Sequence, residues 1–362
     1  MMTATTAINA INKAVRAYSD IRHISFFGGE PTLNIELIEI VCEFVLFLRR
    51  KRILNELPTF GITTNGYALD ERVLQVLQKY DFSITLSLDG PKPIHDKERP
   101  TRSGKGSYDS IVKNIHRLVA AGLNIEFECT YTLNHLNAEI DIVQLMDFFF
   151  DEFDCHTLHC PIVAASPNSG EYIPLNVSLA LQGDAVEYSI ENLARNVPKT
   201  LSTAVRFLQS VTTHTPIWHY CPAGKSEITV NADGELFACF MLMQTPAYSF
   251  GSVNSCRDVQ MQQTPFRIIG IGSGTEKEQV ENMINSADKF ANIACRCCWA
   301  QPLCHGCLGE DFERMGPAIH RSEISGVSEF CDYKRALAER FLRAVARAHR
   351  VTGNTGPAVV YA

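Results

Sequence analysis

Five short segments rich in β-branched and aromatic residues alternate with helical patterns over the first 165 residues, and this alternation constrains the fold more than any other feature. The segments are residues 21–27, 59–63, 82–88, 123–132 and 155–163. Their length and composition are typical of buried strands. Strands separated by helices imply right-handed crossovers and a parallel sheet, either open or curled into a barrel. We therefore expect an α/β fold.

The helical patterns between these segments carry recognisable ends. Residues 70–80 begin with an Asp cap, and residues 107–121 begin with a Ser cap and end at Gly122. Residues 33–51 and 138–150 show the same period. The chain also opens with a helical pattern, about residues 3–18, that has no strand before it. In a βα series such a helix follows a strand, so we expect a strand upstream of Met1.

The alternation stops after Pro161. Helical patterns are expected at 177–195 and 199–213, a hairpin at 227–230 and 235–240, a loop at 270–274, and helices at 276–291 and 332–350. The expected domains are a partial barrel over 1–165, a helical connector over 166–220, a cysteine-rich domain over 221–350, and a tail over 351–362.

Composition excludes several classes of protein. The chain is 46% hydrophobic and 20% charged, which predicts an ordinary packed core. Its net charge of −7 argues against a nucleic acid or an acidic membrane as partner. The most apolar stretch, residues 35–48, contains three glutamates and cannot span a bilayer. No secretory signal is visible at the start. We expect a soluble cytoplasmic protein that has neither a nucleic-acid nor a membrane partner.

Cysteines give the strongest chemical signal. Nine of the 13 lie in the last 142 residues. Two residues separate Cys295 from Cys298, five separate Cys298 from Cys304, and two separate Cys304 from Cys307. Cys331 follows after a further 23 residues. Upstream, the turn of the predicted hairpin lies between Cys221 and Cys239. Clustered thiols in a reducing compartment indicate metal binding. Seven thiolates exceed one four-coordinate site, so two sites are implied. On spacing alone these could be structural zincs or iron–sulfur clusters.

Three polar or glycine-rich motifs follow consecutive predicted strands. They are the segments Phe-Phe-Gly-Gly-Glu-Pro at 26–31, Thr-Thr-Asn-Gly at 63–66 and Ser-Leu-Asp-Gly at 87–90. The carboxyl ends of parallel strands form the edge where α/β folds bind ligands. Each motif alone is typical of an ordinary turn. Three on neighbouring strands predict a ligand site at this edge.

Together with His95, Asp96, Arg99 and the 104–107 Gly-Lys-Gly-Ser segment, these motifs and the cysteine-rich end resemble radical S-adenosylmethionine (SAM) enzymes of the SPASM group. That group includes anaerobic sulfatase-maturating enzymes and many maturases of ribosomally made peptides. The resemblance covers about residues 3–341. It implies a partial (β/α)6 TIM-like barrel, here without its first strand, followed by a C-terminal SPASM domain.

The resemblance also implies a SAM site and two auxiliary [4Fe–4S] clusters. Gly28, Gly29 and Glu30 would face the methionine amino group of SAM. Asn65, Ser87 and Asp89 would line the site, and Arg99 would lie near the SAM carboxylate or the substrate channel, although a surface ion pair explains Arg99 equally well. The ligands by family pattern are Cys221, Cys239 and Cys307 for the first cluster, and Cys295, Cys298, Cys304 and Cys331 for the second.

Two departures affect the first cluster. Cys304 and Cys307 are separated by two residues where the group usually has three, and Glu227 stands where many members have a further cysteine. The first cluster would then have three protein ligands and an open iron. Cys256 and Cys297 are candidate fourth ligands, although both also suit spare thiols.

The CxxxCxxC motif that defines the group is absent from the sequence. It would precede the opening helix, so we expect either a true start upstream of Met1 or a truncated gene; as printed, the chain is not expected to hold the radical-generating cluster.

The leading hypothesis is a peptide- or protein-modifying radical SAM oxidoreductase that acts by hydrogen abstraction on a peptide substrate, with a reductant such as flavodoxin or ferredoxin. The alternatives are a truncated, non-catalytic iron–sulfur or zinc protein that binds a peptide or partner, and an anaerobic sulfatase-maturating enzyme. The last is less favoured because Phe240 stands where that subgroup places an acid. No general base can be named from the sequence.

Overall fold

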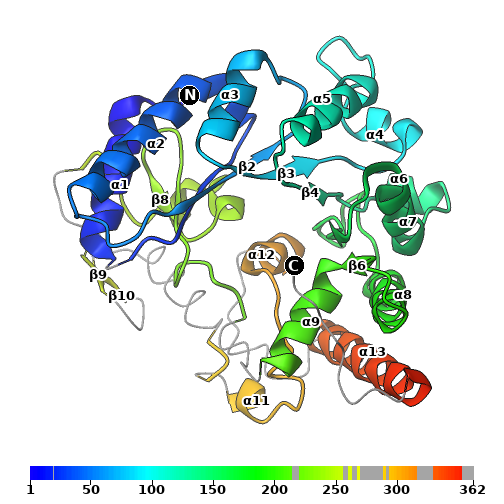
Figure 1. Cartoon of the computed structure of the whole chain (residues 1–362). Coiled ribbons are helices and arrows are strands. Elements are labelled where there is room, and N and C mark those ends of the chain that lie inside the picture. Colours follow the sequence, from blue (N-terminus) through cyan, green and yellow to red (C-terminus); the bar gives the residue numbers. More distant parts are fainter. Residues whose placement is uncertain are drawn as a thin grey trace. The chain divides into compact units, whose positions relative to one another are not determined.

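The computed structural model describes residues 1–18, 20–213, 220–255, 260–262, 267–269, 288–290, 293–315 and 329–352. Six strands form one sheet in the order β1-β2-β3-β4-β5-β6 (Figure 1). They are β1 His23–Phe26, β2 Thr59–Thr64, β3 Ser83–Ser87, β4 Ile125–Glu128, β5 Thr157–His159 and β6 Thr200–Leu201. Because strand order follows chain order and the recorded pairings are parallel, each connection is a crossover through helix. The predicted α/β class and partial TIM-like barrel are confirmed.

Helices make up most of the rest. The α-helices are α1 Ala4–Ala17, α2 Ile35–Arg50, α3 Glu71–Lys79, α4 Lys92–Glu98, α5 Tyr108–Ala120, α6 Leu133–Asn137, α7 Ile142–Phe153, α8 Leu175–Ala194, α9 Ser202–Thr212, α11 Ile293–Arg296, α12 Leu308–Met315 and α13 Glu329–Thr352. Three short 3-10 helices lie at η1 Pro31–Asn34, η2 Phe240–Leu242 and η3 Pro246–Tyr248. Two hairpins complete the described chain: β7 Thr229–Val230 with β8 Leu236–Phe237, and β9 Gln260–Gln262 with β10 Arg267–Ile269.

Most predicted elements lie where the sequence places them. All five predicted strands and the hairpin at Asn231–Gly234 are present, and Thr3 caps the opening helix through its side chain. One difference concerns residues 199–213, which were predicted to be wholly helical. In the structure, Thr200 and Leu201 form strand β6, and α9 begins at Ser202. The loop predicted at 270–274, most of the helix predicted at 276–291, and residues 353–362 of the tail lie outside the described residues.

Contacts divide the chain into two compact units. The first contains residues 1–86, 110–125 and 221–287, and the second contains 87–109, 126–220 and 288–362. This division leaves the four domains expected from the sequence as a prediction.

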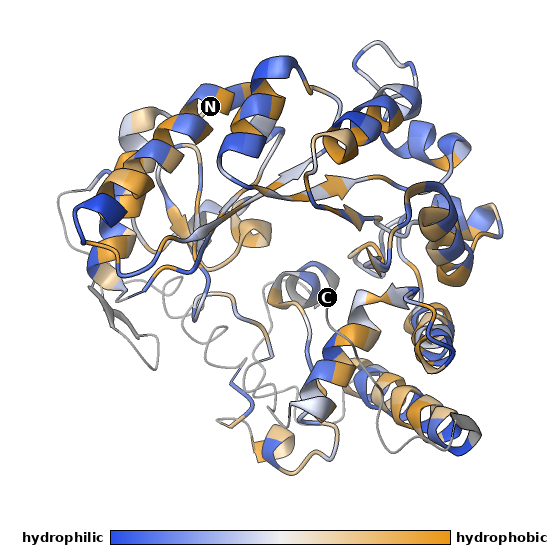
Figure 2. Ribbon diagram, in the orientation of Figure 1, coloured by the Kyte–Doolittle hydropathy of each residue, from blue (hydrophilic) through white to orange (hydrophobic). Residues whose placement is uncertain are grey.

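In the first unit, helices cover the sheet with apolar faces. Val41, Cys42 and Val45 of α2 are buried, as are Phe60 and Ile62 of β2. Figure 2 shows the two-sided character of these helices, orange on one side and blue on the other. This amphipathic pattern is what the 3.6-residue period in the sequence predicts.

In the second unit, Phe127 of β4 packs against Phe149 of α7 in a tilted arrangement, with ring centroids 5.3 Å apart. Helices α8 and α13 lie side by side (Figure 1), joined by the Arg340 guanidinium, which donates to Asp184 at 2.5 Å and to Glu187 at 2.6 Å.

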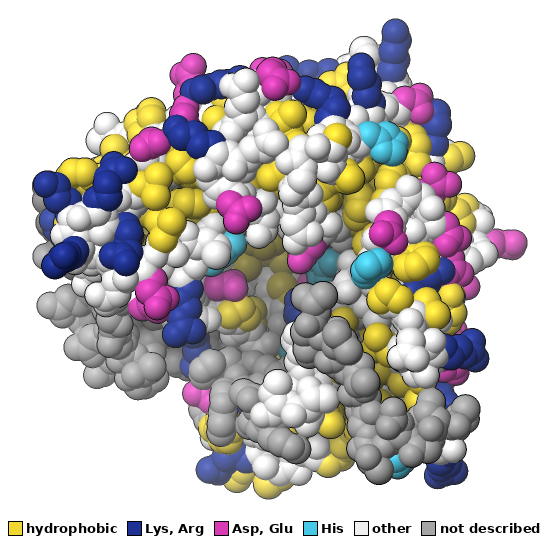
Figure 3. Space-filling model, in the orientation of Figure 1, with side chains coloured by type: hydrophobic (Ala, Val, Ile, Leu, Met, Phe, Trp, Pro, Cys, Tyr) yellow, Lys and Arg dark blue, Asp and Glu magenta, His cyan; other side chains and the backbone are white. Residues whose placement is uncertain are grey.

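Among the described residues, no helix is both long enough and apolar enough to cross a bilayer. On the face drawn in Figure 3, acidic and basic side chains are intermixed along the upper edge.

Candidate functional site

The first motif forms a corner at the end of β1 that one carboxylate organises. Oε1 of Glu30 accepts hydrogen bonds from the Thr32 amide at 3.1 Å, the Thr32 hydroxyl at 2.6 Å and the Thr64 hydroxyl at 2.7 Å. Its Oε2 accepts from the Asn65 amide at 2.9 Å. Glu30 therefore ties the end of β1 to the end of β2, and its carboxylate is already occupied by protein donors.

Gly28 and Gly29 precede this carboxylate and leave their backbone open. Both have positive φ angles, +99° and +36°, in the region that favours glycine. Apart from chain neighbours, no described atom lies within 4 Å of the position that a Cβ would take at either residue. A ligand can therefore approach this backbone closely, and it would meet peptide groups rather than the Glu30 carboxylate.

The second and third motifs end their strands differently. The Asn65 side chain accepts from the Tyr67 amide at 2.8 Å and so shapes the turn after β2. Ser87 closes β3 and is half-buried between Leu86 and Leu88, which are fully buried on the other face.

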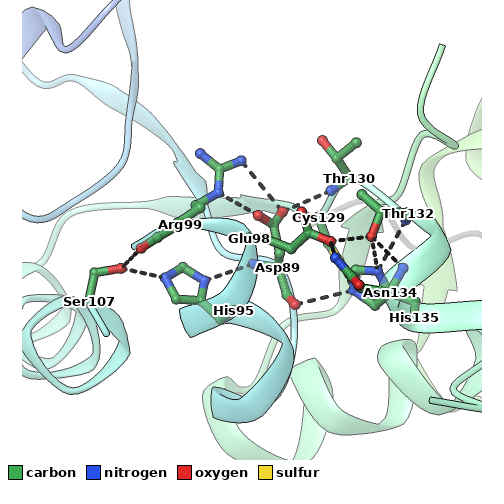
Figure 4. Close-up of polar contacts among 10 residues, drawn as sticks. All are labelled: Asp89, His95, Glu98, Arg99, Ser107, Cys129, Thr130, Thr132, Asn134 and His135. Carbon is green, nitrogen blue, oxygen red and sulfur yellow. Dashed lines mark hydrogen bonds and ion pairs between the residues drawn. The ribbon is translucent and has the colours of Figure 1, made fainter. Parts of the chain in front are cut away.

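Asp89 and Arg99 form an ion pair (Figure 4). Nε of Arg99 donates to Oδ2 of Asp89 at 2.5 Å, and the Asp89 side chain is only 5% exposed. Oδ1 of Asp89 accepts from the Thr130 amide at 3.1 Å. Of the two interpretations that the sequence left open for Arg99, the structure shows an ion pair, but with a buried carboxylate rather than at the surface.

Two buried histidines hold the backbone of Asp89 (Figure 4). Nδ1 of His95 accepts from the Asp89 amide at 3.1 Å, and Nε2 of His135 lies 3.2 Å from the Asp89 carbonyl. Ser107 donates to the Arg99 carbonyl at 2.6 Å, which leaves Nε2 of His95 to donate to the Ser107 hydroxyl at 3.0 Å. Burial lowers the pKa of His95, so its imidazole is neutral, as this hydrogen-bond pattern requires.

Glu98 extends the network to the segment after β4. Its Oε1 accepts from the Thr132 hydroxyl and from Asn134 Nδ2, the latter at 2.7 Å. The loop that carries Arg99 is thus anchored on both sides, and the guanidinium is held in one position.

Two residues of the inner sheet face were missed in the sequence. Glu128 and His159 are register partners on β4 and β5, and both lie opposite the buried residues that pack on helices. Burial raises the pKa of Glu128, and burial lowers the pKa of His159 to about 4. Nδ1 of His159 lies 2.9 Å from the Ser202 hydroxyl, at the start of α9. The signal in the sequence was their position near strand ends. Both strands are too short for the alternation of side chains to show which face of the sheet each residue occupies.

The four ligands predicted for the second cluster, Cys295, Cys298, Cys304 and Cys331, all lie in the second unit. Burial raises the pKa of Cys304, with Cys295 and Cys331 raising it further and Lys334 and Lys289 opposing them. Cys298 and Cys295 are linked by a turn in which the Cys298 amide donates to the Cys295 carbonyl at 3.1 Å. Thiols of this set therefore lie near enough to influence one another's ionisation, which suits a polythiolate site.

The other predicted ligands fall in different units. Cys221 and Cys239 belong to the first unit; burial raises the pKa of Cys239, and Cys221 and Glu227 raise it further. Glu227, which stands where many members of the group have a further cysteine, thus lies near the Cys239 thiol. Cys307 belongs to the second unit, Cys297 is exposed and Cys256 lies outside the described residues.

Among the described residues, no three His, Cys, Asp or Glu side chains are gathered where they could hold a single metal ion. The ligand assignments therefore stay a prediction.

An exposed aromatic pair flanks the glycine corner. Phe27, 50% exposed, and Phe240, 43% exposed, have ring centroids 4.4 Å apart. Phe240 follows Cys239 directly, so the position next to this thiol carries an aromatic ring and no acid.

Comparison with known proteins identifies one domain of the chain. The radical SAM superfamily model matches residues 4–149. Residues 4–149 belong to the radical SAM superfamily.

Curated relatives match part of the chain. The cysteine-type anaerobic sulfatase-maturating enzyme of Clostridium novyi is 31% identical over 134 residues, 36% of this chain and 35% of the relative. The radical SAM cyclopropyl synthase TigE of Paramaledivibacter caminithermalis is 29% identical over 147 residues, 39% of this chain and 29% of the relative. The chain thus spans only about a third of the length of these relatives.

Solved structures share the fold. Native anSMEcpe with bound AdoMet has a TM-score of 0.73 at 16% identity, covering 97% of this chain and 91% of that one. Streptococcus suis SuiB bound to S-adenosylmethionine has a TM-score of 0.54 at 14% identity, covering 87% and 68%. The likeness to anSMEcpe shows that the two proteins share a fold over nearly the whole chain.

Proposed function

We propose that the chain binds SAM at the carboxyl edge of β1–β3 and belongs to an enzyme that modifies a peptide or protein by hydrogen abstraction. The observation that carries this proposal is the glycine corner. Gly28 and Gly29 leave open backbone at the ligand edge of a radical SAM domain, and Glu30 fixes that backbone by bonding Thr64 and Asn65.

The chain's own residues have distinct roles in this proposal. The carbonyl groups of the corner would accept from the ammonium of the methionine part of SAM. Ser87 is half-buried at the same edge and would contact the ligand directly, as would Asn65. Asp89 would act by holding Arg99, whose guanidinium would face a carboxylate.

The seven cysteines would hold two auxiliary clusters, one on Cys295, Cys298, Cys304 and Cys331, and one on Cys221, Cys239 and Cys307. The thiol chemistry fits, because soft thiolates are the usual ligands of [4Fe–4S] clusters. When bound, such clusters supply one-electron transfer. A small redox protein such as flavodoxin or ferredoxin would provide reducing electrons.

A maturase of ribosomally made peptides fits the site better than a sulfatase maturase. Phe240 places an apolar ring beside Cys239, tilted against the Phe27 ring, where an acid would be needed for the second function. Sulfatase maturation stays the second candidate because several curated relatives carry that name. Anisotropy of a fluorescent sulfatase-motif peptide separates the two: we expect no saturable binding, and tight binding would favour the second candidate.

A non-catalytic binding protein is the third candidate, because CxxxCxxC spacing is absent from the sequence. Sequencing the codons upstream of Met1 tests it: an in-frame CxxxCxxC supports the enzyme, and a stop codon supports the binding protein.

SAM binding itself is testable on the chain as it stands. Anaerobic titration calorimetry should give saturable binding to the wild type and at least about tenfold weaker binding to Gly28→Val and Ser87→Ala. Glu36→Gln, an exposed change on α2, is the control and should bind normally. Unfolding midpoints of all variants check that a loss is local. Absence of binding by folded wild-type protein would refute the proposal.

A further inference from the structure

A fully buried lysine lies beside the second cysteine set. The Lys289 side chain is 2% exposed, and its ammonium donates to the Gln301 carbonyl at 2.7 Å and to the Cys304 carbonyl at 2.8 Å. Among the described residues, no carboxylate forms an ion pair with it. Its hydrogen bonds are therefore accepted by neutral groups, and within the part of the chain that the structure describes no carboxylate balances its charge.

Such an arrangement is costly unless an anion lies close by. Removing an ammonium from water costs several kcal/mol even after relaxation, and neutral carbonyls repay only part of that. The groups whose charges act on Lys289 are Cys304, Cys295 and Cys298. Burial lowers the pKa of Lys289 and these three cysteines oppose that shift, so thiolates, the form in which cysteines hold a cluster, would balance its charge.

The loop between these cysteines fixes the geometry. The Cys298 amide donates to the Cys295 carbonyl at 3.1 Å, the Gln301 amide to the Cys298 carbonyl at 3.1 Å, and the Cys304 amide to the Ala300 carbonyl at 2.8 Å. The Lys289 ammonium donates to the Gln301 and Cys304 carbonyls, which lie at the end of these turns. The ammonium is therefore held in place against the loop that carries three of the four predicted ligands.

Other cations nearby are more accessible to solvent. Lys334 acts on Cys304, and Arg335 hydrogen-bonds Cys298, but the Arg335 side chain is 27% exposed and pairs with Asp332 at 2.5 Å. Water and the neighbouring carboxylate weaken the field of Arg335. Lys289 differs from Lys334 and Arg335 in being buried, so water screens its charge less, while Lys334 has the larger effect on the Cys304 thiol.

We propose that Lys289 is the built-in counter-cation of the iron–sulfur cluster held by Cys295, Cys298, Cys304 and Cys331, and that its charge raises the reduction potential of that cluster. This inference rests on the proposed function, since it requires a cluster at these cysteines. One-electron reduction adds a negative charge to the site, and a fixed positive charge favours the reduced form.

The test measures a potential rather than activity. The starting protein carries Cys239→Ala, which removes a ligand of the other proposed cluster and leaves one titrating site. Anaerobic protein is titrated with dithionite as electron donor, and the reduced cluster is followed by electron paramagnetic resonance. Lys289→Gln keeps a hydrogen-bond donor for the two carbonyls and removes the charge, Lys289→Arg keeps the charge, and Lys97→Gln, an exposed change on α4, is the matched control.

The expected result is a shift of the midpoint potential to more negative values in Lys289→Gln alone, so that several-fold less cluster is reduced at the wild-type midpoint. An unchanged midpoint would overturn the inference. If Lys289→Gln loses iron and sulfide altogether, retention by Lys289→Arg supports a charge role, and equal loss by Lys289→Arg overturns it. Absence of iron and sulfide from the wild type would instead refute the proposed function, which the iron and sulfide assay identifies before any titration.

Discussion

The Glu30 corner gives the sharpest structural prediction. Glu30→Gln keeps one carbonyl oxygen and replaces the other oxygen with an amide nitrogen. With the carbonyl towards Thr32 and Thr64, the new NH2 meets the Asn65 amide, so that two donors face each other across the 2.9 Å contact. A hydrogen bond to a charged group contributes about 1.5–3 kcal/mol. We expect the local opening free energy at Asn65 to fall by about 2 kcal/mol, which corresponds to about thirtyfold faster amide exchange.

Hydrogen exchange followed by mass spectrometry on peptides covering residues 59–67 measures this directly. Glu36→Gln makes the same change of charge on the exposed side of α2 and should leave the exchange of these peptides unchanged. Unaltered exchange in Glu30→Gln would show that its carboxylate does not hold the two strand ends together, and the argument for a fixed glycine corner would fail.

Two further predictions concern the second unit. Arg99→Met leaves the buried Asp89 carboxylate without its cation. Because Arg99 is partly exposed, we expect the free energy of unfolding, measured in urea, to fall by only about 2–3 kcal/mol. The exposed control Arg102→Met should change it by less than about 0.5 kcal/mol, and equal effects of the two substitutions would contradict the ion-pair argument. Folding lowers the pKa of His159 from 6.5 to about 4. Its contribution to the free energy of unfolding is therefore fully present above about pH 6.5 and is lost as the pH falls towards 4. Between about pH 7 and pH 4, the wild type should therefore lose up to about 3 kcal/mol more of its free energy of unfolding than His159→Gln does. Parallel curves of unfolding free energy against pH would refute this.

Much of the fold could be predicted because its signals are local. β-branched runs, caps such as Thr3 and Asp70, and the turn at Asn231–Gly234 each lie within a few residues of sequence. The exception, β6, consists of Thr200 and Leu201 alone. Two residues carry no readable period, and β6 exists because Thr200 can pair with Thr157 on a strand 43 residues away.

The site was predictable by position and less so by contact. The structure has Glu30 and Asp89 after β1 and β3, at the strand ends where the motifs placed them, and their contact with a ligand stays a prediction. The sequence does not contain the information that the Glu30 carboxylate would be consumed by Thr64 and Asn65, or that His135 would reach the Asp89 carbonyl from 46 residues away. Such contacts depend on how separate elements meet, and a lone histidine has the same appearance in a core and in a catalytic site.

The most direct test of the account is an iron and acid-labile sulfide assay on anaerobically purified protein. If the chain carries two auxiliary clusters, wild-type protein should contain about eight irons and eight sulfides, and Cys298→Ala about four of each. Zinc without sulfide, or a colourless protein with neither iron nor sulfide, would contradict it.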